Sequence, residues 1–162
     1  YSGGFPRKKD YDSLVHTQRA IYYTQRELED IVAHIGKNTQ LIICDRGSLD
    51  SIAYWPDPEN HFYESLQTNK TRELARYDWV LHLDTATAEF YDLSNPIRTE
   101  TYSEALELND KIKKAWQGHP RRIIIPHTPD FITKMSISTL VIKAILNQES
   151  MEEISLRYLK ST

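Results

Sequence analysis

The chain has 162 residues, 40% of them hydrophobic, which is enough to bury the core of one domain over residues 1–162. Its 20 basic and 23 acidic residues give a net charge of −3, so there is no basic field of the kind that binds nucleic acid. The single cysteine excludes a disulfide framework within the chain, and no apolar run reaches the roughly 18 residues that span a membrane. We therefore expect a soluble, cytoplasmic protein that binds neither nucleic acid nor membrane.

The first part of the chain predicts a helix, a strand and two further helices. Apolar side chains recur at helical spacing over residues 12–35, and Gly36 ends the pattern. Residues 40–44 are continuously apolar, which is typical of a short strand buried on both faces of a parallel sheet. Residues 47–54 and 62–76 are predicted to be helical.

The middle of the chain predicts a second buried strand over residues 79–83, followed by a short helix over residues 86–92. Residues 101–104 read Thr-Tyr-Ser-Glu, which is a capping box, and the helix that it opens is expected to end at Gly118.

A third buried strand is predicted over residues 122–125. Thr128 is then expected to cap a helix over residues 129–147, with proline at its first position. Strands and helices thus alternate three times, and the strands have no polar face. This pattern predicts an α/β fold with a parallel sheet and helices on both sides.

Polar residues follow each predicted strand directly. Asp45 and Arg46 follow the first strand, Asp84 follows the second, and His127 and Thr128 lie just beyond the third. In open parallel sheets, ligands bind beyond the carboxyl ends of the strands. We therefore expect the functional site at this edge of the sheet.

Asp45 is a candidate metal ligand and catalytic residue, because phosphate-transferring folds hold Mg²⁺ with an acidic residue at the end of a buried strand. The planar guanidinium of Arg46 suits a phosphate or an acidic substrate group. The alternative is a structural role, in which Asp45 and Arg46 bind each other or the end of a neighbouring helix.

No phosphate-binding loop of the form G-x-x-x-x-G-K-[ST] occurs in the sequence. The nearest approach is Gly36-Lys37-Asn38, but Ile31 stands at the position of the first glycine and Asn38 replaces the hydroxyl residue. This segment also ends a helix instead of opening one, so we interpret it as a helix cap and turn.

Arg98 lies in a polar stretch between the second and third predicted strands. An arginine on such a loop can close over a nucleotide and neutralise charge that develops on phosphate. The alternative is an exposed ion pair of little energetic value, and the loop by itself favours that alternative. Gln18, Gln25 and Glu29 lie near one face of the first predicted helix, which is usually the solvated face of an amphipathic helix.

A series of short motifs occurs in order along residues 2–147. They are Gly3-Gly4-Phe5-Pro6, Gln18-Arg19-Ala20-Ile21 with Gln25 and Glu29, Asp45-Arg46-Gly47-Ser48-Leu49-Asp50-Ser51 with Tyr54, Tyr77-Asp78-Trp79-Val80, Arg98-Thr99-Glu100-Thr101, and Asp130-Phe131 with Lys134. Each motif is weak alone, whereas their order and spacing are fairly specific. In these motifs the chain resembles the P-loop family of predicted ATPases related to the nicotinamide-riboside kinase domain of bacterial NAD-synthesis proteins.

The resemblance implies a three-layer αβα sandwich with a parallel sheet, of the nucleoside-kinase type, that binds ATP or GTP with Mg²⁺ and a small-molecule acceptor. Asp45 would be the metal-binding or general-base carboxylate, and Arg98 would belong to the lid. The implied catalytic residues are Asp45, Arg46 and Arg98, the implied substrate-binding residues are Gln18, Asp50, Tyr54 and Glu100, and the implied nucleotide-binding residues are His127, Thr128 and Asp130.

The chain departs from this family in one respect. Members begin with a strand and a G-x-x-x-x-G-K-[ST] loop, to which nothing here corresponds. About 30 to 50 further residues, roughly one βαβ unit, would supply both. Either the chain is truncated or the phosphate loop has been lost, and the start at Tyr1 favours truncation.

We therefore expect a Mg²⁺-dependent, kinase-like enzyme that phosphorylates a small nucleoside-like acceptor. Two alternatives stay open: a nucleotide-responsive switch without a dedicated acceptor, and a degenerate structural domain that binds no nucleotide.

Overall fold

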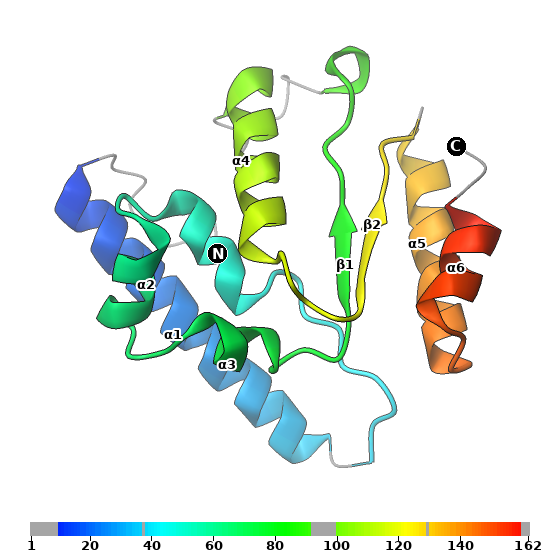
Figure 1. The fold of residues 1–162 in the computed structure, drawn as a ribbon, viewed down its shortest axis with the longest axis horizontal. Coiled ribbons are helices and arrows are strands. Elements are labelled where there is room, and N and C mark those ends of the chain that lie inside the picture. The colour runs from blue at the N-terminus through cyan, green and yellow to red at the C-terminus, as the bar shows by residue number, and fades with distance from the viewer. Residues whose placement is uncertain (1–9, 37, 92–99, 129, 160–162) are drawn as a thin grey trace. The chain divides into compact units, whose positions relative to one another are not determined.

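The computed structural model describes residues 10–36, 38–91, 100–128 and 130–159 (Figure 1). These residues form two compact units. Unit 1 comprises the described residues within Tyr1–Arg76 and Lys114–Gln117, and unit 2 comprises those within Tyr77–Lys113 and Gly118–Thr162.

Unit 1 is helical, and its longest element confirms the first predicted helix. The helices are α1 (Tyr11–Ile35), the 3-10 helix η1 (Ser48–Tyr54), α2 (Glu59–Ser65) and α3 (Lys70–Leu74). Helix α1 begins where the Asp10 carboxylate accepts a hydrogen bond from the backbone N–H of Ser13, and it ends at Gly36. The predicted helix over residues 47–54 is present as η1.

The prediction of one helix over residues 62–76 is wrong, because the chain turns between α2 and α3. Gln67 has a φ angle of 53°, and a helix cannot continue through this left-handed conformation. Asn69 then caps α3 by accepting a hydrogen bond from the backbone N–H of Arg72.

The core of unit 1 is aromatic. Tyr22, Leu49 and Phe62 are fully buried, and Trp55 is buried beside them. The ring of Phe62 meets Tyr22 and Trp55 edge to face, with centroids 5.9 and 5.3 Å apart. These contacts join α1, the residue that follows η1, and α2.

The predicted strand over residues 40–44 is wrong. The segment forms no strand, and Leu41, Ile42 and Ile43 are exposed, Ile43 by 68%. A strand is stabilised by hydrogen bonds to a neighbouring strand, and within the described ranges only two other segments pair in this way. The apolar side chains of Leu28, Ile31, Val32 and Ile35 on α1 are likewise exposed.

Unit 2 contains a parallel pair of strands, β1 (Val80–Leu83) and β2 (Arg122–Ile125), which confirms the other two predicted strands. The 3-10 helix η2 (Ala88–Phe90) and helix α4 (Tyr102–Ala115) come between the strands; the last two residues of α4 belong to unit 1. Helices α5 (Phe131–Leu146) and α6 (Met151–Tyr158) follow β2.

The capping residues of unit 2 agree with the sequence in one helix and differ in another. Thr101 and Glu104 form the expected reciprocal hydrogen bonds at the start of α4. The expectation that Thr128 caps α5 is wrong, because the Asp130 carboxylate accepts the backbone N–H of Thr133 at 2.7 Å. A carboxylate two residues further on is the stronger acceptor, and it takes the cap.

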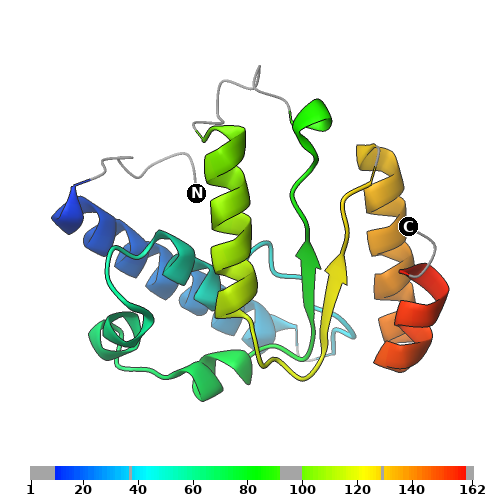
Figure 2. The ribbon, with the colours of Figure 1, turned by 45° about the horizontal axis from the view of Figure 1, so that its top comes forward.

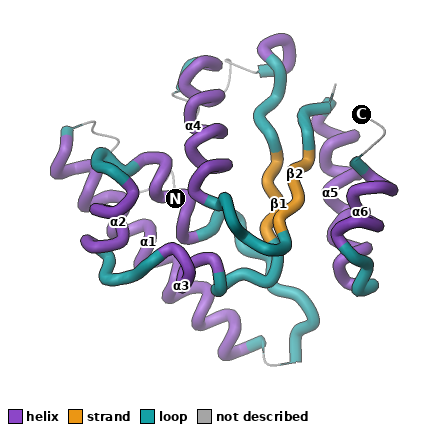
Figure 3. The backbone as a smooth tube through the Cα atoms, in the orientation of Figure 1, coloured by secondary structure: helices purple, strands orange, loops and turns teal. Residues whose placement is uncertain are grey.

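The two faces of the sheet in unit 2 have different neighbours. Ile123 and Ile125 form a core with Val141 and Ala144 of α5 and with Ile154 of α6. Helix α4 lies on one side of the strands and helices α5 and α6 on the other, as Figures 2 and 3 show. The parallel α/β arrangement is thus present, but the described residues form a sheet of two strands, so the three-layer sandwich is not confirmed.

No helix in the described ranges combines the length and the apolarity needed to cross a lipid bilayer.

Candidate functional site

Asp45 of unit 1 has an exposed side chain. Within the part of the chain that the structure describes, no hydrogen bond or ion pair involves it. It caps no helix, because the residue that precedes η1 is Gly47. The structural alternative for Asp45, a partner in Arg46 or a helix end, therefore finds no support among these residues.

Arg46 has an unusual backbone. Its φ angle is 81°, in the left-handed region that costs about 1–2 kcal/mol for a residue with a Cβ atom. Its guanidinium is 63% exposed, and the nearest acid is Asp50, with Nη1 and Oδ2 3.6 Å apart. At that distance and exposure the ion pair contributes little stability, so the guanidinium is accessible to an anionic ligand.

The remaining predicted residues of unit 1 differ from Asp45 and Arg46 in their contacts and burial. Asp50 of η1 accepts a hydrogen bond from the indole N–H of Trp116 at 2.6 Å. Tyr54, the last residue of η1, is partly exposed. Gln18 of α1 is buried, with 7% of its surface exposed, so it does not lie on a solvated helix face.

Gln25 and Glu29 connect α1 with the loop that carries Asp45. The amide Nε2 of Gln25 donates to the backbone carbonyl of Arg46 at 3.2 Å and to Oε1 of Glu29 at 2.8 Å. Glu29 also binds Arg76, with Nη2 and Oε2 2.9 Å apart. The interpretation of Gln25 and Glu29 as a solvated face is therefore wrong, because both side chains bind distant parts of unit 1.

A second cluster of polar residues surrounds Asp84, where β1 ends in unit 2. Its Oδ1 lies 2.7 Å from Nδ2 of Asn109 and 2.5 Å from Nζ of Lys113. Burial acts to raise the pKa of Asp84, but the bonds from Lys113 and Asn109 hold this pKa below its usual value. The backbone carbonyl of Asp84 accepts a hydrogen bond from Lys134 of α5.

His82 extends this cluster into the sheet. Its Nε2 lies 2.9 Å from Oδ1 of Asn109, whose amide group donates to Asp84. Burial lowers the pKa of His82, so the buried ring is neutral at pH 7. Sequence reasoning noticed Asp84 after its strand but assigned it no role. The only sequence signal for its partners is that Asn109 and Lys113 lie four apart, on one face of a predicted helix.

The predicted residues beyond β2 lie at the start of α5. His127 is exposed, and the buried Thr128 donates its hydroxyl hydrogen to the carbonyl of Asp130 at 2.7 Å. Thr133 holds the pKa of Asp130 low through two hydrogen bonds, so this carboxylate is occupied as a cap. Glu100 accepts a hydrogen bond from the Tyr91 hydroxyl at its carbonyl oxygen.

Arg98, the motif at residues 3–6 and Pro129 lie outside the described residues. The structure thus brings together Asp45, Arg46 and Asp50 with Gln25 and Glu29 of α1 in unit 1, while His127, Thr128 and Asp130 lie together in unit 2.

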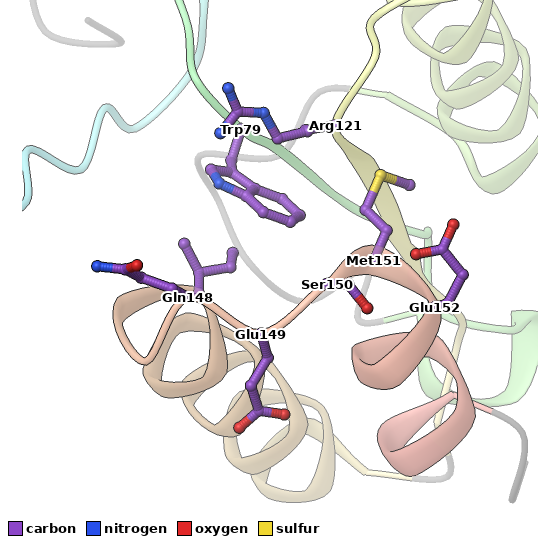
Figure 4. Close-up of a pocket in the computed structure, with 8 residues that line it drawn as sticks. Trp79, Arg121, Gln148, Glu149, Ser150, Met151 and Glu152 are labelled. Atoms are coloured by element: carbon purple, nitrogen blue, oxygen red, sulfur yellow. The ribbon is translucent and has the colours of Figure 1, made fainter.

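A pocket of about 560 Å³ lies elsewhere in unit 2, beside the residues that precede the two strands (Figure 4). Trp79, Ile145 and Met151 supply apolar lining, and Glu149 and Glu152 also line the pocket. The guanidinium of Arg121 lies over the Trp79 ring, 5.7 Å from its centroid. In parallel sheets, ligands bind beyond the carboxyl ends of the strands, whereas this pocket lies at their amino ends, so it is separate from the predicted nucleotide site.

Among the predicted site residues of unit 1, Asp45 is the candidate ligand for Mg²⁺. Within the described ranges no group of three or more His, Cys, Asp or Glu side chains is arranged to hold a metal ion. Proteins that use Mg²⁺ with phosphates commonly bind it through one or two carboxylates, and the phosphates and water complete the octahedron. An exposed carboxylate without a described partner meets this requirement.

Comparison with known proteins assigns the family. A family model described as an AAA domain matches residues 5–131, which is most of the chain. The comparisons with curated proteins and with solved structures give no match. The family match confirms the expected P-loop type, whereas the relation to the nicotinamide-riboside kinase domain stays a prediction. The chain therefore belongs to the AAA domain family, a P-loop NTPase-type family of nucleotide-binding proteins.

Proposed function

We propose that this chain takes part in Mg²⁺-dependent phosphoryl transfer from ATP or GTP to a small nucleoside-like acceptor, with Asp45 at the reacting centre. Membership of the AAA domain family supports nucleotide binding. The observation that carries the finer proposal is the state of Asp45, an exposed carboxylate with no described partner next to an accessible guanidinium. A carboxylate kept for structure alone would have a partner.

In this proposal each candidate residue of unit 1 has its own role in the reaction. The Asp45 carboxylate binds the metal ion or accepts the proton of the acceptor hydroxyl, whose oxygen forms the new bond to phosphorus as the nucleotide's bridging bond breaks. Arg46 holds an anionic group with its planar fork, and Asp50 and Tyr54 lie on the acceptor side. Mg²⁺, when bound, neutralises charge on the phosphate oxygens. Arg98 acts from the lid.

Substitution of Asp45 tests the proposal. Asp45→Asn changes the charge with almost no change in volume, so it should keep the fold and lower phosphoryl transfer by roughly 10²-fold or more. Arg46→Lys should also lower transfer, because an ammonium cannot bind an anion with two parallel bonds. The matched control is Asp12→Asn, which removes an exposed acid at the start of α1, away from this loop.

Transfer and the melting temperature should be measured on the same Asp45→Asn sample, in the complete protein. A lowered melting temperature with intact transfer would make Asp45 a structural residue and contradict the proposed function.

A further inference from the structure

Helix α1 contacts the residues on either side of Asp45. Glu29 lies against the thiol of Cys44, where burial and the neighbouring carboxylate raise the pKa of that thiol. Gln25 donates to the backbone carbonyl of Arg46 at 3.2 Å. The Cys44 side chain and the Arg46 backbone carbonyl thus both face α1, one on each side of Asp45. The exposure of Asp45 agrees with this arrangement.

The contacts form one continuous chain of hydrogen bonds. Arg76 donates to Oε2 of Glu29 at 2.9 Å, and Oε1 of Glu29 accepts from Gln25 at 2.8 Å. The side chains of Arg76 and Glu29 are only 17% and 12% exposed, so water competes weakly for these bonds. A carboxylate can only accept, and Glu29 therefore fixes which end of the Gln25 amide faces the loop. The second hydrogen on the same nitrogen reaches Arg46.

The recipient of this bond is the residue with the strained backbone. Arg46 has a φ angle of 81°, which a residue with a Cβ atom keeps only when its surroundings hold it there. The bond from Gln25 to the Arg46 carbonyl is such a restraint. Without this bond, we expect the Arg46 backbone to relax out of the left-handed region, which would change the direction of the neighbouring Asp45 side chain.

We propose that Gln25 and Glu29 of α1 and Arg76, just beyond α3, form a positioning relay that holds the backbone around Asp45 and so aims its carboxylate at the reacting centre. The catalytic purpose of the relay rests on the proposed function. Its structural effect, which is to hold the loop, is independent of that function. The two statements are therefore tested by different experiments.

Limited proteolysis tests the loop itself. Trypsin cleaves after arginine only where the backbone can become extended, and Arg46 is exposed but held in a left-handed conformation. Gln25→Ala should increase the initial rate of cleavage between Arg46 and Gly47 by about fivefold or more, which corresponds to the loss of about 1 kcal/mol of restraint. The cut is identified by the masses of the two products.

Two further variants keep this test decisive. Gln25→Glu preserves the volume of the side chain but cannot donate, so it should accelerate the same cleavage even if Gln25→Ala folds poorly. Glu27→Ala alters an exposed acid on the same helix and should leave the rate unchanged. Equal cleavage after Arg46 in Gln25→Glu and in the unsubstituted protein would overturn the relay.

A double-mutant cycle tests the connection to Asp45. In the complete protein Gln25→Ala should lower kcat about tenfold, with a small change in KM for the nucleotide, because the loss falls on the chemical step. In the Asp45→Asn background the same change should cost almost nothing, since the aimed carboxylate is already gone. Losses that multiply in the double variant would overturn the relay. An unchanged transfer rate in Asp45→Asn would instead overturn the proposed function, with the proteolysis result unaffected.

Discussion

Tyr22 of α1 donates its hydroxyl hydrogen to Oε1 of Glu73 of α3 over 2.7 Å, and the acceptor is a carboxylate with no exposed surface. Thr68 donates to the same oxygen at 2.5 Å. Burial acts to raise the pKa of Glu73, but these bonds, with Ser48 of η1 and the charge of Arg26, hold it below its ordinary value. Glu73 is therefore a buried anion that joins three segments of unit 1.

Tyr22→Phe should destabilise unit 1 by about 1–3 kcal/mol, because it removes one hydrogen bond from a buried charge without leaving a large cavity. The loss should be measured as the free energy of unfolding in urea at pH 7. A group with a depressed pKa stabilises the fold above its unfolded pKa, near 4.5, and this contribution is lost as the pH falls through the folded value. The effect of Tyr22→Phe should accordingly shrink in acid. Tyr23→Phe, at the exposed neighbouring residue, should change the free energy by less than about 0.5 kcal/mol.

His82 should make unit 2 sensitive to mild acid. Its ring is buried and its pKa lies below the usual 6.5, so the unfolded chain takes up a proton that the folded chain resists. Stability from this group is present above pH 6.5 and is lost as the pH falls toward the folded pKa, with a slope of at most about 1.4 kcal/mol per pH unit. Unfolding free energies between pH 7 and 5 measure this slope.

His82→Gln keeps a donor for Asn109 but does not titrate, so it should flatten the slope. His34→Gln, at an exposed position of α1, should not. The same pH dependence in the His82→Gln variant and the unsubstituted protein would assign the acid sensitivity to other groups.

Arg98→Ala should lower phosphoryl transfer much more than it lowers stability. An arginine that closes over phosphate contributes in the transition state, whereas an exposed loop arginine changes the free energy of unfolding by less than about 0.5 kcal/mol. Turnover and urea unfolding of the same variant decide the matter. Turnover equal to that of the unsubstituted protein would favour the alternative, in which Arg98 forms an exposed ion pair and has no catalytic role.

Residues 1–162 should bind ATP and GTP weakly. The phosphate contacts of P-loop proteins come mainly from backbone N–H groups of a glycine-rich loop, and no G-x-x-x-x-G-K-[ST] sequence occurs in these residues. Titration calorimetry with each nucleotide and Mg²⁺ measures the affinity. A Kd on the order of 1 µM or tighter would show that other residues supply the phosphate contacts.

Short sequence patterns correctly predicted the elements that are stabilised by residues close together in the sequence. Helix α1 follows from apolar spacing and a glycine stop, and the capping box at Thr101 and Glu104 marks the start of α4. Strands β1 and β2 were predicted from apolar runs, and each has a partner to pair with. The identical argument failed for residues 40–44, because an apolar run specifies a strand only where another strand accepts its hydrogen bonds.

The contacts of the candidate site were predicted only in part, because several of them join residues far apart in the sequence. Asp45 and Arg46 were chosen as candidates from their position after an apolar run. The bond from Arg76 to Glu29 joins residues 47 positions apart, and no spacing rule reveals it. Without that bond, Gln25 and Glu29 look like a solvated helix face, which is what the sequence indicated.

The exposed apolar segment at Leu41–Ile43 has a consequence for handling the protein. A short β-prone run without charge can pair with the same run of another molecule, and charges placed directly beside such a run suppress aggregation. Asp45 and Arg46 follow this run, separated from it only by Cys44, so their charges should suppress such pairing whether or not they also bind phosphate. Asp45→Asn thus removes a charge that keeps molecules apart, and its samples should scatter more light as the protein concentration rises.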